Sequence, residues 1–261
     1  MDESLIRSNL KSPDNFHFHV FNEIDSTNSF LVNLGNRNEP EWTIAVAEKQ
    51  NAGKGRLDRK WESPEGVGLW FSVLLRPDIH PDQTHMINLL CAISLSDFLE
   101  QKIKSYIGKG INIKLKWPND LLINGKKLVG ILLQTSIIAE EVSFLVLGIG
   151  LNVNQDLSDF PNELKNRAVS LKMVTNINWN REEILAEFIE YFYKYYYLYF
   201  PVSQDEILNL YQTKVLYKNE VITLNFDGNQ IKGVFKGLTS NGYLILQIGD
   251  EEKIITTGEI I

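Results

Sequence analysis

The 261-residue chain is poor in cysteine and has no long apolar run. Cys91 is its only cysteine, so a disulfide within the chain is excluded. Cys91 lies in an apolar helical pattern with no partnering base nearby, which favours packing over a catalytic or redox thiol. No apolar run approaches the roughly 20 residues that cross a bilayer as a helix. The first residues also lack the features of a secretory signal. We therefore expect a cytoplasmic protein with no membrane segment.

The chain also lacks an excess of basic charge. Its net charge of −7, from 33 acidic and 26 basic residues, argues against extended nucleic-acid binding, which needs a broad basic surface. Nine of the 26 basic residues gather in two islands, at residues 49–60 and 114–127. Two basic islands in an acidic chain suit a small anionic ligand better than a polymer.

The first island is a loop rich in glycine and cations. Glycines on both sides of Lys54 allow positive φ and close approach to a ligand, and the cations that follow can neutralise carboxylate or phosphate. Trp61 adds a flat aromatic face. If the segment stood alone, a solvated basic loop would be the more common explanation. The loop contains Gln50, Gly53, Lys54, Gly55, Arg56, Arg59, Lys60 and Trp61.

The order of sequence patterns predicts a larger part followed by a smaller one. A capped helix begins near Ser26 and is closed by Gly35, and Asn124-Gly125 is a strong two-residue hairpin signal. After Tyr217, short strands and turns predict a small β-barrel of about SH3 size. Further strands are expected at 42–47, 67–75, 113–117, 121–123, 128–133 and 142–153, and helices at 82–107, 181–200 and 205–211, the first of them amphipathic. The aromatic stripe of the 181–200 helix is expected to pack against the fold, and Gly148 and Gly150 permit close backbone approach by a ligand.

Four segments carry a resemblance to a known family. They are residues 25–28, the glycine loop, Lys116-Trp117-Pro118-Asn119-Asp120 with residues 125–130, and residues 148–152. Their order and spacing resemble the biotin–protein ligases from about residue 20 to 155, and the end of the chain is similar to that family's carboxy-terminal domain. The resemblance implies an α+β fold: a mixed β-sheet flanked by helices in a catalytic domain (1–213), with a small SH3-like β-barrel (214–261).

The resemblance also implies a reaction in two steps. The carboxylate of biotin attacks the α-phosphorus of ATP, which gives biotinyl-5′-AMP and pyrophosphate. A lysine of a biotin carboxyl carrier protein, part of a carboxylase, then attacks the mixed anhydride. Magnesium is expected to arrive with ATP and to lie near Asp120, without direct protein ligands assigned. A homodimer through an exposed sheet edge is open, because the sequence does not show one.

Site residues follow from positions that match the family's motifs. Arg56, Lys127 and Asp120 are the expected catalytic residues: the two cations offset repulsion between the anionic substrates, and Asp120 orients Lys127 or assists magnesium. The expected biotin-binding residues are Ser26, Thr27, Asn28, Gln50, Gly53, Lys54, Gly55, Arg56, Lys127 and Gly130. The expected nucleotide-binding residues are Arg59, Lys60, Trp61, Asn119, Lys127 and Asn152, with Trp61 stacking on adenine.

One part of the loop departs from the family pattern. The family commonly has arginine where this chain has Lys54, and glycine where it has Asp58. Lys54 keeps the charge, whereas Asp58 removes a freely pivoting position and places a carboxylate beside the anionic site. We therefore expect Asp58 to affect the closing of this loop and its retention of the intermediate.

Three alternatives remain to be separated. A lipoate ligase or octanoyltransferase has a related fold but does not need the polar group around Gln50. A biotin- or nucleotide-binding module without turnover is a second alternative, which Arg56 and Lys127 argue against. Some family members are also DNA-binding repressors, but only about 20 residues precede the first motif. We therefore expect a ligase that does not bind DNA.

Overall fold

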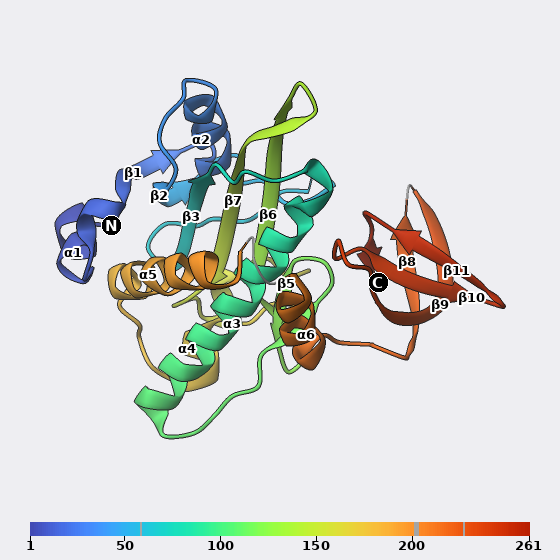
Figure 1. Cartoon of the computed structure of the whole chain (residues 1–261). Coiled ribbons are helices and arrows are strands. Elements are labelled where there is room, and N and C mark those ends of the chain that lie inside the picture. Colours follow the sequence, from blue (N-terminus) through green and yellow to red (C-terminus); the bar gives the residue numbers. More distant parts are fainter. Residues whose placement is uncertain (58, 201–203, 227) are drawn as a thin grey trace.

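A seven-stranded mixed sheet lies at the centre of the larger part of the chain (Figure 1). The computed structural model describes residues 1–57, 59–200, 204–226 and 228–261, so Asp58 lies outside the described residues. The strand order is β1-β2-β3-β7-β6-β5-β4, and only β1 and β2 pair in parallel. The strands are β1 (His17–Ile24), β2 (Thr43–Gln50), β3 (Gly68–Leu75), β4 (Lys114–Lys116), β5 (Asp120–Ile123), β6 (Lys126–Ile138) and β7 (Glu141–Asn152).

Helices cover both faces of this sheet. The long helices α3 and α5 pack on one face, and α2 packs on the other through contacts with β2, β3 and β7 (Figure 1). This confirms the predicted α+β fold, a mixed sheet flanked by helices. The helices are α1 (Glu3–Ser8), α2 (Thr27–Gly35), α3 (Thr84–Ile107), α4 (Leu171–Thr175), α5 (Arg181–Tyr199) and α6 (Gln204–Lys214), with 3-10 turns at Pro13–Asn15, Pro81–Gln83 and Leu157–Asp159.

Side chains alternate between the two faces of the sheet, and the hydrophobic core is large on one face and small on the other. On β3, Leu69, Phe71 and Val73 join the main hydrophobic core beneath α3 and α5. On the opposite face, Leu74 belongs to a much smaller apolar cluster under α2. Because successive strand residues point to opposite faces, the remaining outward positions of β3, β6 and β7 are left for other partners. These positions form the floor of the candidate site.

The helix predicted at 82–107 is not amphipathic over most of its length. From Thr84 to Glu100, only His85, Asp97 and Glu100 are not buried, and exposed residues begin at Gln101. The reason is that α3 is enclosed by the sheet, α5 and α6, so both sides of the helix meet protein. The expectation of a solvent-facing polar stripe was therefore wrong for this part. Cys91 is fully buried there, and burial raises the pKa of its thiol.

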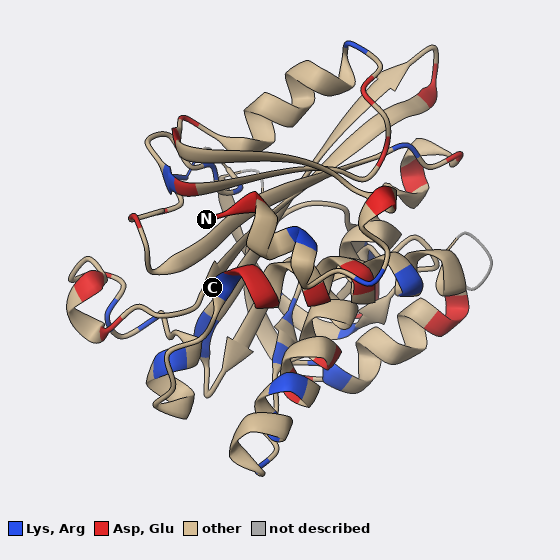
Figure 2. Ribbon diagram, turned by 90° about the vertical axis from the view of Figure 1, so that its left-hand side faces the viewer, with Lys and Arg blue, Asp and Glu red and all other residues tan. Residues whose placement is uncertain are grey.

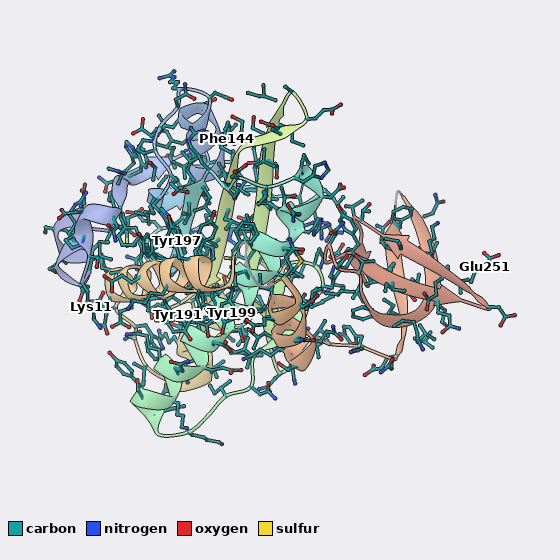
Figure 3. All side chains as sticks on the ribbon, viewed as in Figure 1. Lys11, Phe144, Tyr191, Tyr197, Tyr199 and Glu251 are labelled. Carbon is teal, nitrogen blue, oxygen red and sulfur yellow. The ribbon has the colours of Figure 1, made fainter. Side chains whose placement is uncertain are left out.

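The aromatic residues of α5 pack against the fold, as the sequence predicted. Phe188 and Phe192 are buried, and their rings stack with centroids 5.9 Å apart. Trp42, which precedes β2, packs edge-on against Phe192 at 5.7 Å. Only part of the stripe reaches solvent: Tyr197, labelled in Figure 3, is half exposed and donates to Glu41.

Ion pairs join the helices, with Lys and Arg lying among Asp and Glu (Figure 2). The Lys102 ammonium is 2.7 Å from Glu183 and links α3 to α5. The Lys214 ammonium is 2.7 Å from Glu100 and links α6 to α3. None of the helices in the described ranges is long and apolar enough to span a membrane.

The C-terminal residues form a five-stranded antiparallel sheet in the order β11-β10-β9-β8-β12. Its core includes Leu224, Phe235 and Leu246, and it receives Trp117 from the larger part. The Trp117 indole donates to the carbonyl of Gly242 at 3.1 Å, so the two parts are packed together. The division at 213/214 stays a prediction. The strands are β8 (Val221–Phe226), β9 (Asn229–Leu238), β10 (Leu244–Ile248), β11 (Glu251–Ile255) and β12 (Glu259–Ile260).

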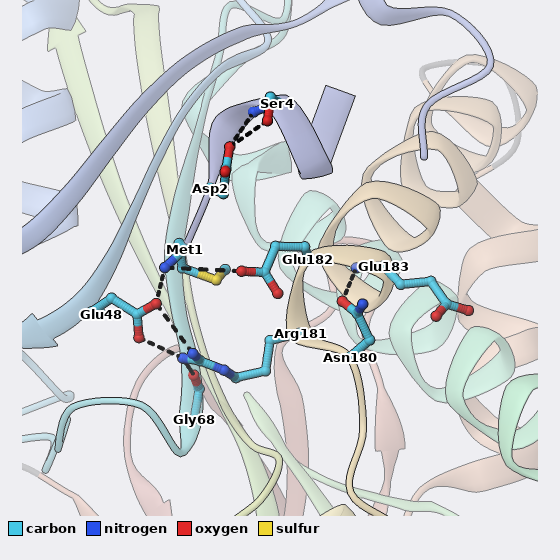
Figure 4. A network of polar contacts seen from close by, with 9 residues as sticks. All are labelled: Met1, Asp2, Ser4, Glu48, Gly68, Asn180, Arg181, Glu182 and Glu183. Atoms are coloured by element: carbon cyan, nitrogen blue, oxygen red, sulfur yellow. Dashed lines mark hydrogen bonds and ion pairs between the residues drawn. The ribbon is translucent and has the colours of Figure 1, made fainter. Parts of the chain in front are cut away.

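A largely buried ion pair ties β2 to α5 (Figure 4). Arg181 donates to Glu48 at 2.7 and 3.1 Å and to the carbonyl of Gly68 at 3.1 Å. The two side chains are only 13% and 11% exposed. Glu48 also pairs with the amine of Met1, which begins the segment that leads into α1. No helix was predicted before residue 26, yet α1 forms there, capped by Asp2, which accepts from the Ser4 amide at 2.7 Å.

We expect Arg181→Met to destabilise the fold by about 3 kcal/mol, because it leaves Glu48 buried with the Met1 amine as its remaining charged partner. Lys49→Met is the matched control on the same strand. Lys49 lies 3.2 Å from Glu23, but these side chains are 40% and 54% exposed, so its loss should cost less than about 1 kcal/mol. Urea unfolding measures both changes, and equal effects would contradict the assignment.

Candidate active site

The outer face of β3, β7 and β6 forms the floor of a cavity of about 790 Å³. Its centre has little side-chain bulk, because Gly148 and Gly150 lie on β7 and Gly130 pairs opposite Gly150 on β6. Every predicted site residue except Gly53 lines this cavity. Gly53 lines a neighbouring groove, and its carbonyl accepts from the Trp61 amide at 2.9 Å.

The glycines of β7 admit two side chains of the protein itself. A Cβ on Gly148 would lie 1.9 Å from Asn28 Oδ1, and a Cβ on Gly150 would lie 2.3 Å from Trp61 Cε2. The sequence predicted close approach by a ligand at these positions. In the structure Asn28 and Trp61 make that approach, and they thereby become part of the cavity's lining.

A continuous polar network lines one end of the cavity. Gln50 Oε1 accepts from the Thr27 amide at 2.8 Å, and the Thr27 hydroxyl lies 2.8 Å from that of Ser72. Ser72 in turn donates to Asn28 Oδ1 at 2.5 Å, and Asn28 Nδ2 donates to Gln134 at 3.1 Å. The network holds neutral donors and acceptors at the start of α2, where Ser26 accepts from the Ser29 amide at 3.3 Å as the predicted N-cap.

Arg56 is held between the larger part and the C-terminal domain. Its guanidinium donates to Asn119 Oδ1 at 3.2 Å and to the hydroxyl of Thr257 at 3.3 Å. Burial lowers the pKa of Arg56, while the charges of Asp120 and Glu259 oppose that shift. An arginine remains charged under such a shift. The cavity therefore contains a partly buried cation next to Asn119.

Two further cations of the loop, which also line the cavity, form ion pairs. Arg59 forms a two-pronged pair with Glu259, with one bond of 2.7 Å. This hydrogen bond raises the pKa of Arg59. Burial alone would raise the pKa of Glu259, but the hydrogen bond and charge of Arg59 outweigh it and lower the pKa. Lys60 lies 3.0 Å from Glu62, and Lys54 is exposed.

Lys127 and Asp120 lie together on the β5–β6 hairpin. The Lys127 ammonium is 2.8 Å from Asp120 Oδ1 and 5.1 Å from the centroid of the Trp61 ring. Asp120 thus lies where a residue that orients Lys127 must lie. The Asn124-Gly125 turn that sets this arrangement is the one the sequence predicted, with both residues at positive φ.

A magnesium ion would meet few carboxylates here. Within the described ranges, no group of three or more His, Cys, Asp or Glu side chains could hold a metal. Mg²⁺ bound with a nucleotide typically uses only one or two carboxylates, with phosphates and water. Asp120 fits that requirement, since it lines the cavity beside the two cations.

Comparison with known proteins gives matches along most of the chain. Residues 20–152 match the sequence profile of the biotin/lipoate A/B protein ligase family. The chain belongs to this family. Residues 219–261 match the biotin protein ligase C terminal domain, which confirms the predicted SH3-like ending.

Relatives with matching sequence or structure include biotin ligases. The bifunctional ligase/repressor BirA of Bacillus subtilis is 35% identical over 265 residues, which cover 100% of this chain and 78% of the relative. The biotin–[acetyl-CoA-carboxylase] ligase of Paracoccus denitrificans is 27% identical, with 90% and 96% covered. The structure of the Aquifex aeolicus biotin protein ligase in complex with biotin and ATP is similar at a TM-score of 0.75, with 30% identity and 94% and 97% covered. The predicted resemblance to biotin–protein ligases is confirmed.

The sequence patterns did not predict several residues that line the cavity or support its lining. Ser72 and Gln134 carry no motif, and they meet Asn28 only because of the pairing of β3, β7 and β6. Glu259 reaches the loop from a strand about 200 residues away. Gln155 follows Asn152 closely, and that short spacing was the only available signal.

Replacing Gly150 by alanine should displace the Trp61 indole. The chain has five tryptophans, so a nitrogen-15 NMR spectrum reports five indole signals. We expect Gly150→Ala to shift the Trp61 signal and to destabilise the fold by about 1–3 kcal/mol through overpacking. Gly110→Ala is the control, because a Cβ there meets no atom within 4 Å. An unchanged Trp61 signal in Gly150→Ala would refute the contact.

Proposed function

We propose that this biotin protein ligase makes biotinyl-5′-AMP in the cavity lined by Trp61, Gly130 and Gly150 and then transfers biotin to a lysine of a biotin carboxyl carrier protein. The observation that carries the proposal is the convergence of Arg56, Lys127 and Asp120 on a cavity whose other lining includes a neutral polar network. A reaction between two anions needs such cations, and a neutral heterocycle needs such a network.

The polar network suits the ureido ring of biotin. This ring is neutral and offers both N–H donors and a carbonyl acceptor. Thr27, Gln50 and Asn28 supply hydroxyl and amide groups of both kinds at the start of α2. Ser72 couples these groups to one another, so they are held in place before the ligand arrives. An aliphatic acid such as lipoate has no ureido group to use these donors and acceptors, which disfavours the lipoate ligase alternative.

Arg56 and Lys127 act on the reacting oxygens. Attack by the biotin carboxylate on the α-phosphorus builds charge on the phosphate oxygens, and fixed cations stabilise that charge. The planar fork of Arg56 suits two oxygens at once, while the single ammonium of Lys127 can follow one oxygen as charge moves. Asp120 orients Lys127 through the 2.8 Å ion pair.

The nucleotide would lie between the loop and the end of β7. Asn119 and Asp120 lie beside the phosphates, where magnesium bound to ATP would meet the Asp120 carboxylate. Trp61 and Asn152 contact the base, and Arg59 and Lys60 approach the phosphates if the loop leaves its ion pairs with Glu259 and Glu62. The expected location of the reaction is the cytoplasm.

One assay separates the candidate activities. The protein is mixed with Mg-ATP, a biotin carboxyl carrier domain and either biotin or lipoate, and the carrier is analysed by mass spectrometry. Biotin addition supports the proposal. Lipoyl addition in preference to biotin would support the lipoate ligase, and ligand binding with an unmodified carrier would support the binding module.

Lys127→Ala should lower the rate of adenylate formation by about 100-fold or more, the usual effect of removing one charge-stabilising donor. Lys126→Ala, in the same hairpin, is the matched control and should keep the wild-type rate. Pyrophosphate release measures both rates, and circular dichroism checks that both variants are folded. A folded Lys127→Ala variant with a near-normal rate would refute the role of Lys127.

A further inference from the structure

One wall of the cavity combines several apolar side chains with two buried amides, and Asp159, Asn166 and Arg167 also line it. Asn152 and Gln155 are only 5% and 2% exposed. A flat, uncharged base fits such a wall, whereas the triphosphate fits the end with Arg56 and Lys127. The inference below therefore rests on the proposed use of ATP. The apolar lining consists of Phe160, Pro161, Leu164 and Ala168.

Hydrogen bonds fix the orientation of Gln155. The Asn152 amide nitrogen donates to the backbone carbonyl of Lys127 at 3.3 Å, so its oxygen faces Gln155. Gln155 Nε2 donates to that oxygen at 3.0 Å. The hydroxyl of Ser170 anchors the Gln155 backbone by donating to its carbonyl at 2.7 Å. Gln155 Oε1 is therefore fixed as an acceptor.

This acceptor has no hydrogen-bond partner among the described residues, although it is buried and its side chain lines the cavity. Most buried carbonyl oxygens are paired, because leaving one unpaired destabilises the protein. The nearby Asn154 differs in this respect, because both ends of its side-chain amide are paired. Its Nδ2 donates to the Trp179 carbonyl at 2.9 Å, and its Oδ1 accepts from the Trp179 backbone amide at 2.8 Å. Gln155 keeps an unused acceptor where Asn154 does not.

We propose that Gln155 selects adenine, with Oε1 accepting a hydrogen bond from the 6-amino group of the base. A base with a 6-keto oxygen, such as guanine or hypoxanthine, would place a second acceptor against Oε1. Both oxygens would then lack a donor, so ATP is favoured over GTP and ITP. Gln155 acts beside Asn152, which it also holds in place.

ATP and ITP differ mainly in the group at position 6 of the base. The ratio of kcat/KM for ATP to kcat/KM for ITP therefore measures the contact between this group and Gln155. Wild type should prefer ATP at least about tenfold, the size expected for one buried hydrogen bond and its mismatch. Gln155→Met should lower kcat/KM for ATP about tenfold and keep the KM for biotin. It should not lower kcat/KM for ITP, because it removes the acceptor that opposes the 6-keto oxygen. The preference of the enzyme for ATP over ITP is then lost. A wild-type preference retained in Gln155→Met overturns the proposal, as does equal use of ATP and ITP by wild type.

Ser170→Ala is the control for a merely structural effect. It loosens the Gln155 backbone but keeps Oε1, so it should lower the melting temperature and retain the ATP preference. Loss of that preference would count against the proposal.

If Gln155→Met does not fold, purine riboside triphosphate, which lacks the 6-amino group, is given to wild type. A loss of about tenfold relative to ATP supports the contact, and equal use overturns it. Failure of wild type to turn over biotin with any of these nucleotides would instead refute the proposed function.

Discussion

The register between β6 and β7 is the constraint on which the site depends. It pairs Gly130 with Gly150 and thereby makes room for the Trp61 indole against the outer face of the sheet. A shift of one residue would turn these glycines toward α3 and α5 and would bring core side chains into the cavity. Strands β3 and β6 both pair with β7, and inward side chains of all three belong to the main hydrophobic core. The core on one face of the sheet therefore fixes the position of the cavity floor on the other face.

The cavity brings together groups from distant parts of the chain. The start of α2 supplies the polar network, the β5–β6 hairpin supplies Lys127 and Asp120, and the glycine loop supplies Arg56. The C-terminal domain also contributes, since Thr257 and Glu259 bind two arginines of that loop. Because the C-terminal domain packs around Trp117 of the larger part, Thr257 and Glu259 are held in position relative to the loop. The small domain therefore takes part in setting the position of the loop over the cavity.

Local signals in the sequence predicted much of this arrangement. The Asn124-Gly125 turn and the Ser26 cap depend on a few neighbouring residues, so both were found at their places. Gly148 and Gly150 were correctly recognised as sites of close approach, but the approaching groups are Asn28 and Trp61. Which group fills such a space is decided by tertiary packing, which the local sequence does not encode.

Other features arise only from distant contacts. Ser72 and Gln134 become part of the network through strand pairing, and Glu259 through the docking of the C-terminal domain. The solvent exposure of α3 was mispredicted for the same reason, because α5 and α6 cover the face that an isolated helix would expose. The sequence motifs thus identified the candidate site residues. The groups that hold those residues in place come from distant parts of the chain and become apparent only in the folded structure.

The most direct test of the account is to trap the intermediate. Wild-type protein is incubated with biotin and Mg-ATP without a carrier, and the bound small molecules are identified by native mass spectrometry. If the cavity joins the two anions under Arg56 and Lys127, biotinyl-5′-AMP is recovered bound to the protein in place of biotin and ATP. Recovery of both substrates unreacted, under conditions where both bind, would contradict the account.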